Sequence, residues 1–399
     1  MPTFRPSNYI ASCVIAGILA IQSTAAPPKV FVLDGTHLAD VRERALQSPG
    51  EFDTALREIR SDAAEALTAG PWSVMDKRHL PPSGDKHDYY SVGPYWWPDP
   101  SKPDGLPYIR RDGQVNPERY DYDSAGLKNV VSSVHTLAMA WCFTDERQYA
   151  ERATLLLRTW FLNPATKMNP HLQYGQAIPG RTEGRGIGII DTAQLITLVD
   201  AVGLLQPSTA WSDSDHRELQ AWFRAYLQWL LTSSHGIYEA KTKNNHAVWY
   251  DAQVASFALF VDDQRVARET LEQVGPRRIA TQIEPDGRMP HELARTKSFS
   301  YTHMNLRGFL NLARLAEHVD VDLWNFNTAD GRSIEAALDW LEHFVTGRKE
   351  WTYQQISSSD PSHARLLYRR AARMIDKPAY RQIGSKVTDP IDKLLWPET

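Results

Sequence analysis

The chain has 399 residues, of which 42% are hydrophobic and 23% charged, and its formal net charge is −4. A nucleic-acid-binding protein normally carries a basic face, so this weakly acidic balance argues against that class of function. It does not exclude an acidic substrate, because a cleft can be locally basic within an acidic protein.

The N-terminal segment 1–26 has the pattern of a secretory signal peptide. Arg5 supplies a positive charge, an apolar run covers 9–21, and small residues follow up to Ala26. The run is shorter than the roughly 20 residues that a membrane-spanning helix needs. We expect no later segment to be long and apolar enough either. The sequence therefore predicts export to the periplasm or the exterior, no membrane partner, and a single domain over 27–399.

Only one cysteine remains after the signal is removed. Cys13 leaves with the signal, so Cys142 has no partner for an internal disulfide. Its neighbours are Trp141 and Phe143, which predicts a buried, apolar thiol rather than a nucleophile.

After the signal, apolar residues recur mainly at helical spacing. In 214–232, for example, Leu219, Trp222 and Phe223 begin a broad apolar face. This periodicity predicts helices over 126–143, 146–161, 190–204, 214–232, 245–260, 263–282, 302–318, 333–346 and 361–375. Helices of this length with short links predict antiparallel hairpins stacked side by side. The expected fold class is all-α, an α/α toroid whose connecting loops gather at one end.

Two long stretches interrupt the helical pattern, at 81–123 and 163–188. Loops of this length in a compact domain are usually either functional or disordered. The first is rich in Pro, Gly, Asp and aromatic residues, and aromatic residues are depleted in disordered segments. We therefore interpret both stretches as walls of a cleft. The whole chain has 13 Trp and 16 Tyr residues, side chains that stack on sugar rings as well as filling cores.

Familiar catalytic motifs are missing from the sequence. It contains no HExxH, no Cys/His cluster, no phosphate-binding glycine loop and no GxSxG elbow. We expect neither a metal nor a cofactor. The glycines in 180–188 follow no predicted strand, so they do not indicate a dinucleotide site.

The segment 238–249 carries the densest set of chemically useful residues. Asn244 or Asn245 could cap the helix that follows, which is the purely structural reading. A cap does not require two Asn followed directly by His246. A helix N-terminus has unpaired N–H groups and partial positive charge, which suit a substrate carboxylate. The segment therefore predicts an anion site.

A second polar segment, 290–303, leads into an apolar helix. It contains Arg295, Lys297, Tyr301 and two His residues. Considered alone, it fits a solvated helix start with Tyr301 half-buried. Together with Asn245-His246, it favours a shared catalytic site.

These two segments resemble the catalytic residues of the alginate lyase superfamily of polysaccharide lyases. The resemblance rests on 244–246, on Arg295 with Tyr301 six residues later, and on the segments 89–100 and 169–180. The resemblance extends over about residues 30 to 350 of the chain. The resemblance implies an incomplete α/α toroid, no cofactor, and Asn, His, Arg and Tyr around the cleaved bond.

Two spacings refine the resemblance. The position of Glu239, seven residues before His246, is similar to the pattern of the broader alginate and glucuronan lyases. The Arg295–Tyr301 spacing is slightly shorter than in the smaller alginate-only lyases, which argues against an enzyme restricted to mannuronate.

The implied reaction is β-elimination in a uronic-acid polymer, which removes the C5 proton and expels O4. Asn245, His246 and Arg295 would neutralise the carboxylate beside C5 and so stabilise the developing charge. In mannuronate and glucuronate, the proton and O4 share one ring face. Tyr301 could then serve as both base and acid if Arg295 lowers its pKa from about 10. In guluronate the C5 proton and O4 lie on opposite faces of the ring. His246 is therefore the expected base for that sugar, and Glu239 is expected to orient it.

The expected partner is an anionic uronate polysaccharide, bound by a monomer. Subsite residues are expected mainly from the two long loops, and Arg181 and Lys297 are expected to attract further uronates. The residues assigned to substrate binding are Asn244, Trp96, Trp97, Tyr174, Gln176, Arg181, His291 and Lys297.

Two other functions remain open at this point. An inverting glycoside hydrolase on a similar toroid would need two carboxylates roughly 6.5–9.5 Å apart. Its candidates are Asp88, Asp99, Glu183 and Glu239. A non-catalytic polysaccharide-binding protein would keep the aromatic loops but would not need His246 or Tyr301.

Overall fold

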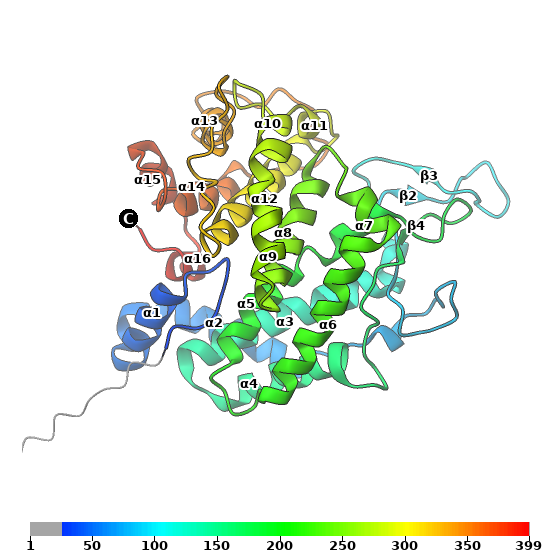
Figure 1. Ribbon diagram of the computed structural model, residues 1–399, viewed down its shortest axis with the longest axis horizontal. Helices are drawn as coiled ribbons and strands as arrows, with labels where there is room; N and C mark the ends of the chain where they lie inside the picture. The colour runs from blue at the N-terminus through cyan, green and yellow to red at the C-terminus, as the bar shows by residue number, and fades with distance from the viewer. Residues whose placement is uncertain (1–25, 399) are drawn as a thin grey trace, which may run out of the picture.

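The computed structural model describes residues 26–398 (Figure 1), so the predicted signal peptide, apart from its last residue, lies outside the described residues. The α-helices are α1 (Gly35–Gln47), α2 (Asp53–Thr68), α3 (Asp123–Thr144), α4 (Arg147–Leu157), α5 (Leu195–Leu205), α6 (Asp213–Thr232), α7 (Ser234–Glu239), α8 (Asn245–Phe260), α9 (Gln264–Glu272), α10 (Ala280–Gln282), α11 (Pro290–Leu293), α12 (Ser298–Glu317), α13 (Ile334–Val345), α14 (Arg365–Ala371), α15 (Pro378–Gly384) and α16 (Pro390–Leu395).

Short 3-10 or π turns and four small strands complete the fold. The turns are η1 (Pro49–Phe52), η2 (Val74–Asp76), η3 (Pro117–Asp121), η4 (Arg158–Leu162), η5 (Gly186–Thr192), η6 (Gly275–Ile279) and η7 (Pro361–Ala364). The strands are β1 (Tyr90–Val92), β2 (Trp96–Trp97), β3 (Ile109–Arg110) and β4 (Tyr174–Ala177).

The helices form an incomplete α/α toroid, as predicted. The inner layer runs α3, α5, α8, α12, α14, and each of these helices packs against the next (Figure 1). The outer helices pack on this layer: α2 and α4 on α3, α6 and α9 on α8, α13 on α12, and α15 on α14. Hairpins of this kind bury the apolar stripe of each outer helix and leave its other face in water.

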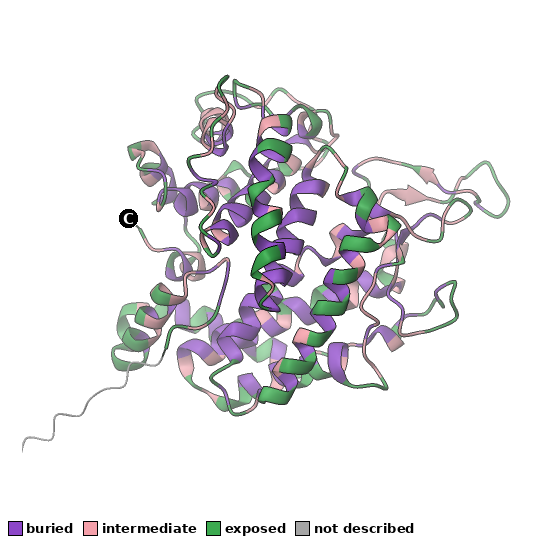
Figure 2. Cartoon of the chain, in the orientation of Figure 1, coloured by how far each residue is buried: buried purple, intermediate pink, exposed green. Residues whose placement is uncertain are grey.

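Helix α8 lies at the centre of the fold and shows why the inner layer is stable. Every residue of α8 except His246 is buried, whereas the outer helices expose one face (Figure 2). Half of its side chains are Ala, Val or Phe, which pack closely between neighbouring helices. The single open position on α8 is therefore the histidine at its first turn.

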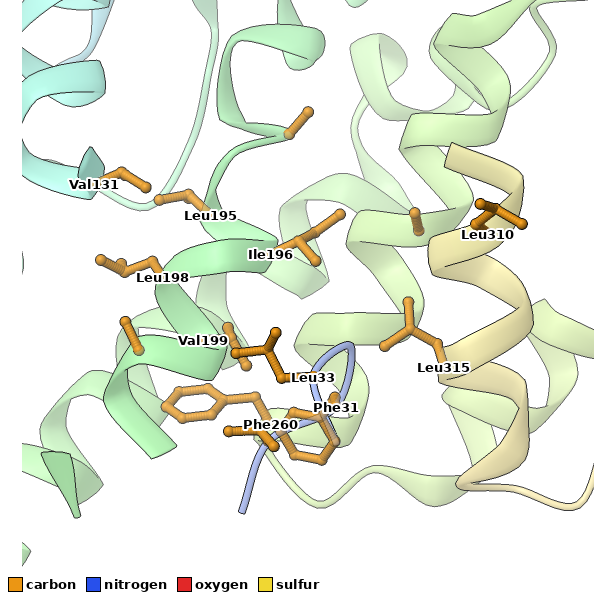
Figure 3. Packing of buried hydrophobic residues seen from close by; sticks show 14 of the residues in the cluster. Phe31, Leu33, Val131, Leu195, Ile196, Leu198, Val199, Phe260, Leu310 and Leu315 are labelled. Atoms are coloured by element: carbon orange, nitrogen blue, oxygen red, sulfur yellow. The ribbon is translucent and has the colours of Figure 1, made fainter. Parts of the chain in front are cut away.

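The N-terminal segment is packed into the core between α5 and α12. Phe31 and Leu33 join the apolar cluster that includes Val199 and Leu315 (Figure 3). The buried carboxylate of Asp200 accepts hydrogen bonds from the backbone N–H groups of 31–33, at 2.7–3.0 Å. Burial raises the pKa of Asp200 to about 6, and these hydrogen bonds oppose that rise.

Helices at the two ends of the chain escaped the sequence prediction. Helix α2 buries Ala55, Ala63 and Ala66 with only two larger apolar residues, so its stripe gives a weak periodic signal. The predicted helix 263–282 is interrupted by the π turn η6, where Pro276 lacks the N–H that a regular helix needs. Cys142 is buried as predicted, and burial raises the pKa of its thiol to about 12.

One expectation about membranes was wrong. Among the described residues, the helical segment Gly186–Leu205 is long and apolar enough to cross a membrane. Within the fold, 67% of its apolar window is buried, and α5 packs against α3 and α8. The segment is therefore accounted for as a core helix.

The two long loops predicted as cleft walls are joined to each other. Strand β1 of the first loop pairs in parallel with β4 of the second, with Tyr90 opposite Tyr174. The first loop also forms the antiparallel pair β2–β3, which projects outward from the body of helices (Figure 1). Backbone pairing thus fixes two segments that are about 80 residues apart in the sequence at the same end of the toroid.

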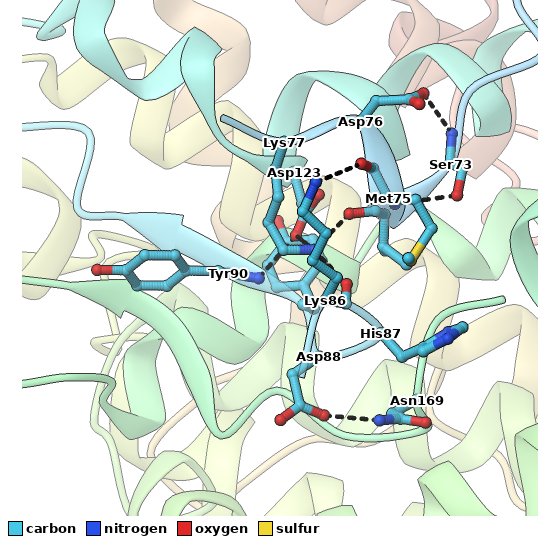
Figure 4. A network of polar contacts seen from close by, with 12 residues as sticks. Ser73, Met75, Asp76, Lys77, Lys86, His87, Asp88, Tyr90, Asp123 and Asn169 are labelled. Atoms are coloured by element: carbon cyan, nitrogen blue, oxygen red, sulfur yellow. Dashed lines mark hydrogen bonds and ion pairs between the residues drawn. The ribbon is translucent and has the colours of Figure 1, made fainter. Parts of the chain in front are cut away.

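A buried ion pair anchors the base of the first loop (Figure 4). The Lys77 ammonium lies 3.0 Å from the Asp123 carboxylate, and both side chains are almost fully buried. Lys77 also donates to the carbonyl of Lys86, and Asp123 accepts from the backbone N–H of Tyr90. Burial raises the pKa of Asp123 to about 7, whereas Lys77 acts in the opposite direction.

We expect Lys77→Met to destabilise the protein by about 3 kcal/mol, because it leaves Asp123 buried without its cation. The loss of unfolding free energy should lie at the low end of the range for a broken buried ion pair, since Asp123 can take up a proton near neutral pH. Urea unfolding at pH 7 measures this difference. The double variant Lys77→Met with Asp123→Leu is the control and should recover most of the stability. A single variant as stable as the wild type would contradict the assignment.

Candidate active site

Seven of the thirteen predicted site residues meet in a cavity of about 410 Å³ at the loop end of the toroid. Both long loops, the start of α8 and the start of α12 contribute to its wall. The lining residues are Pro94, Tyr95, Trp96, Arg110, Arg119, Gln176, Arg185, Ile187, Ile190, Asp191, Asn244, Asn245, His246, Arg295, Tyr301 and Met304.

His246 is held by a buried carboxylate behind it. Its Nδ1 lies 2.7 Å from Oε1 of Glu239, whose side chain is 1% exposed. A carboxylate accepts, so Nδ1 carries the proton and Nε2 of the neutral ring is left as an acceptor. Glu239 does not line the cavity itself. Glu239 thus contacts His246 from behind the cavity, and its orienting role stays a prediction.

Asn245 is fixed by a carboxylate that the sequence analysis did not single out. Its backbone N–H and its side-chain Nδ2 donate to the two carboxylate oxygens of Glu292, at 2.6 and 2.7 Å. Glu292 is fully buried; burial raises the pKa of its carboxyl, and the bonds from Asn245 oppose that rise. The preceding residue, Asn244, occupies the N-cap position without making a side-chain cap bond, so its amide remains available to the cavity.

Tyr301 lies in the first turn of α12. This helix begins four residues earlier than predicted, because its first turn shows no helical spacing of apolar residues in the sequence. Nη2 of Arg295 donates to the Tyr301 hydroxyl at 2.8 Å, and the guanidinium carbon lies 3.9 Å from the centre of the ring. The Tyr95 hydroxyl is also 2.8 Å from the Tyr301 hydroxyl. Asp112 binds Arg295 at 2.9 Å. The four side chains form one connected network.

The expectation that Arg295 lowers the pKa of Tyr301 is only partly correct. Burial and the neighbouring Tyr95 raise the pKa of Tyr301 well above its ordinary value, and the opposing effect of Arg295 is smaller. Asp112 offsets part of the positive charge of Arg295, which sequence reasoning could not foresee. Tyr301 is therefore a neutral phenol in the free protein at neutral pH, ready to donate a proton.

The cavity wall is strongly cationic although the whole protein is acidic. Arg110, Arg119, Arg185 and Arg295 all line it, and the only lining carboxylate among the described residues is Asp191. Arg185 packs over the ring of Trp96 at 5.8 Å, and burial lowers its pKa to about 10. Such a wall attracts a polyanion.

Gln176 organises the side of the cavity formed by the second loop. Its Nε2 donates to Asp191 at 2.8 Å, and its Oε1 accepts from Arg185 at 3.0 Å. Its φ of 48° is unusual for a residue other than glycine. This strained backbone is held by the hydrogen bond from the Gln176 N–H to Ser91 of the first loop.

Seven of the predicted residues line the cavity: Tyr301, His246, Arg295, Asn245, Asn244, Trp96 and Gln176. Five others predicted to bind substrate do not: Trp97, Tyr174, Arg181, His291 and Lys297. The Trp97 indole donates to the Gln114 carbonyl, His291 is exposed on α11, and the Lys297 backbone pairs with Gln355. Arg181 lies over Trp96 at 5.4 Å, next to the cavity. These five positions depend on loop paths that residue spacing does not specify.

Some residues that line the cavity or hold its lining residues were missed, although part of their signal was visible. Tyr95 lies in the aromatic segment 89–100, and Glu292 lies in the segment 290–303. Asp112 and Asp191 have no sequence signal, because only the folded loops bring them to Arg295 and Gln176.

The carboxylates do not fit an inverting hydrolase. None of its four candidates, Asp88, Asp99, Glu183 and Glu239, lines the cavity, and Asp191 alone cannot supply both an acid and a base. Among residues 26–398, no group of three or more His, Cys, Asp and Glu is placed to hold a metal ion.

Comparisons with known proteins agree with this geometry. The family model described as alginate lyase matches residues 73–351. A crystal structure of an alginate lyase from Bacteroides ovatus is 40% identical, with a TM-score of 0.90, over 93% of this chain and 100% of that chain. No protein of curated function matches the chain.

Two more distant structures share the fold. A variant of alginate lyase A1-III complexed with a tetrasaccharide is 15% identical, with a TM-score of 0.58, over 95% of this chain and 98% of that one. Alginate lyase A1-III from Sphingomonas species A1 is 14% identical, with a TM-score of 0.53, over 86% of this chain and 95% of that one.

Proposed function

The chain belongs to the alginate lyase family and is a polysaccharide lyase acting on a uronate polymer by β-elimination, and on this basis we propose that it cleaves polymannuronate or glucuronan. The products would carry 4,5-unsaturated uronate ends. The observation that carries the proposal is the 2.8 Å hydrogen bond from Arg295 to the Tyr301 hydroxyl, in the cavity that is also lined by His246, which Glu239 holds.

The first requirement of the reaction is to make the C5 proton removable. The neighbouring carboxylate must be neutralised so that negative charge can develop on it. Asn245 and His246 stand at the N-terminus of α8, where the helix dipole adds partial positive charge. Arg295, in the short link between α11 and α12, lines the same cavity. Fixed donors of this kind need not reorganise during the reaction.

The second requirement is to move two protons. Tyr301 holds a proton in the free protein, so it can protonate the departing O4 directly. To take the C5 proton of a mannuronate or glucuronate, Tyr301 must first lose its own, and Arg295 stabilises the resulting phenolate. Nε2 of neutral His246 is the base proposed for guluronate, whose C5 proton lies on the opposite face.

The raised pKa of Tyr301 predicts an alkaline limb in the pH–rate profile. The base form is the phenolate, so kcat/KM on polymannuronate should rise with pH above neutrality. The Tyr95 hydroxyl, 2.8 Å from that of Tyr301, contributes to raising the pKa of Tyr301. Tyr95→Phe should therefore move the limb to lower pH, whatever it does to the maximum rate. A limb that stays in place, or moves to higher pH, would contradict this coupling.

The Glu292 carboxylate is expected to position Asn245. The backbone N–H and the side-chain amide of Asn245 each donate to one oxygen of the Glu292 carboxylate. In Glu292→Gln one of these oxygens is replaced by an NH2 donor, so one of the two hydrogen bonds is lost. We expect kcat/KM to fall about tenfold or more, mainly through kcat, with the pH profile keeping its shape. Steady-state kinetics on both polymers measures this. Glu272→Gln, at an exposed position of α9, is the matched control and should leave the rates unchanged.

An absorbance screen tests the substrate proposal. The new C4–C5 double bond absorbs in the near-ultraviolet, so polymannuronate, polyguluronate, glucuronan and hyaluronan can be compared directly. We expect the fastest rise with polymannuronate or glucuronan and none with hyaluronan. If polyguluronate were cleaved faster than both polymannuronate and glucuronan, the substrate proposal would be refuted, while the lyase assignment would stay intact.

We also propose that the protein is exported, since residues 1–26 have a signal-peptide pattern. A uronate polymer is too large to cross a membrane unaided, so cleavage is needed outside the cytoplasm. Cell fractionation followed by N-terminal sequencing tests this, and an uncleaved cytoplasmic chain would contradict it.

A further inference from the structure

A second cavity, of about 580 Å³, lies behind the proposed active site. Three residues, Ile190, Asp191 and Met304, line both spaces and separate them. We call this second space the axial chamber. The polar lining residues on which its chemistry depends are Asp200, Arg307, Asn311, Arg370 and Asp392.

The chamber continues the polar faces that form the active site. On α12, Tyr301, Met304 and Arg307 are spaced three residues apart, so they lie along one face of the helix. On α8, His246 and Trp249 are also three residues apart and lie along one face of the helix. A volume in this range is typical of sites for small molecules. The inner helices therefore present polar groups to both cavities.

Two arginines make the chamber suitable for an anion. Arg307 lines the chamber and lies over the Trp249 ring at 5.1 Å; partial removal of water from its guanidinium lowers its pKa, and no acidic group among the described residues opposes that effect. Arg370 is buried with 8% of its surface exposed, and its Nε has no hydrogen-bond partner among residues 26–398. An arginine nitrogen buried without an acceptor is costly, and a bound anion would satisfy it.

The carboxylates of the chamber do not neutralise these cations by direct pairing. Asp200 accepts three backbone N–H groups, and Asp191 accepts from Tyr89, Ser91 and Gln176. Asp392 raises the pKa of Arg370 by its charge, but the hydrogen bond of that guanidinium goes to Asn311, at 2.8 Å. The chamber thus combines free cationic donors with amide and carboxylate groups that suit hydroxyls.

We propose that the axial chamber binds a single uronate sugar, with its carboxylate on Arg307 and Arg370 and its hydroxyls on Asn311 and the acidic groups. A guanidinium pair recognises a carboxylate by charge and by paired N–H donors. The choice of a uronate over other small anions rests on the proposed function, because cleavage would release such sugars beside this chamber. The chamber is a second site, distinct from the cavity that holds Tyr301.

Binding of sodium glucuronate, measured by titration calorimetry, tests the proposal without requiring catalysis. We expect Arg307→Gln to weaken binding at least about tenfold. This variant breaks no hydrogen bond or ion pair recorded for the described residues, so it should fold, and its initial rate on polymer should stay near wild type. Arg217→Gln, on the outer helix α6, is the matched control and should bind glucuronate normally.

Three further arms make the outcome decisive. Glucose should fail to compete, and acetate should compete far more weakly than glucuronate. Arg295→Gln should abolish polymer cleavage but leave glucuronate binding at the chamber. Glucuronate affinity that is unchanged in Arg307→Gln would overturn the proposal, as would equal binding of acetate and glucuronate. Because these arms measure affinity, failure of the lyase proposal would show only in the cleavage assay.

Discussion

Tyr301→Phe should reduce kcat on every cleaved polymer by about 100- to 10,000-fold, the usual contribution of one positioned acid or base. The variant removes the hydroxyl that bonds both Arg295 and Tyr95, and with it the proton destined for O4. The ring should keep its place, because Arg295 also packs on its face at 3.9 Å. Initial rates of near-ultraviolet absorbance measure the loss.

Two controls separate lost chemistry from lost structure. Tyr120→Phe removes a hydroxyl from a tyrosine that is 65% exposed and outside the cavity, so it should leave kcat unchanged. Polymer binding to Tyr301→Phe, measured by calorimetry, should stay within a few-fold of wild type. Retained activity in Tyr301→Phe would remove this residue from the mechanism, and lost binding would make it a binding residue instead.

His246→Gln should affect different polymers to different extents. The glutamine amide can still donate to the substrate carboxylate, but it cannot take a proton. On polyguluronate, any cleavage should therefore fall by about 100- to 10,000-fold, because the base proposed for that face is lost. On polymannuronate or glucuronan the fall should be nearer tenfold, since Tyr301 still moves both protons. Relative rates on the separate polymers measure the difference.

Glu239→Gln is the companion variant. It keeps the imidazole but replaces the carboxylate that accepts from Nδ1, 2.7 Å away. A loss of about 10- to 100-fold is expected, as for other orienting carboxylates. Thermal unfolding of both variants checks that the buried side of the pair still packs. Equal fractional losses on all polymers in His246→Gln would refute the role of His246 as the guluronate base.

The helical layers could be predicted because their signal is local. Helices such as α6 and α8 repeat apolar residues over many turns, and their bounds in the structure lie within one or two residues of those predicted. Helices α1 and α2 were missed because alanine and charged residues dominate them. The loops required tertiary information, since the pairing of β1 with β4 joins distant segments.

The sequence alone predicted the residues proposed for the chemistry, namely Asn245, His246, Arg295 and Tyr301, because their order and spacing are written in the chain. Only the tertiary structure decided the ionisation of Tyr301. Burial and Tyr95 are contributed by the folded loop, and together they outweigh Arg295. Spacing specifies neighbours along a helix, but a pKa depends on every charge and on all the water that the fold brings near or excludes.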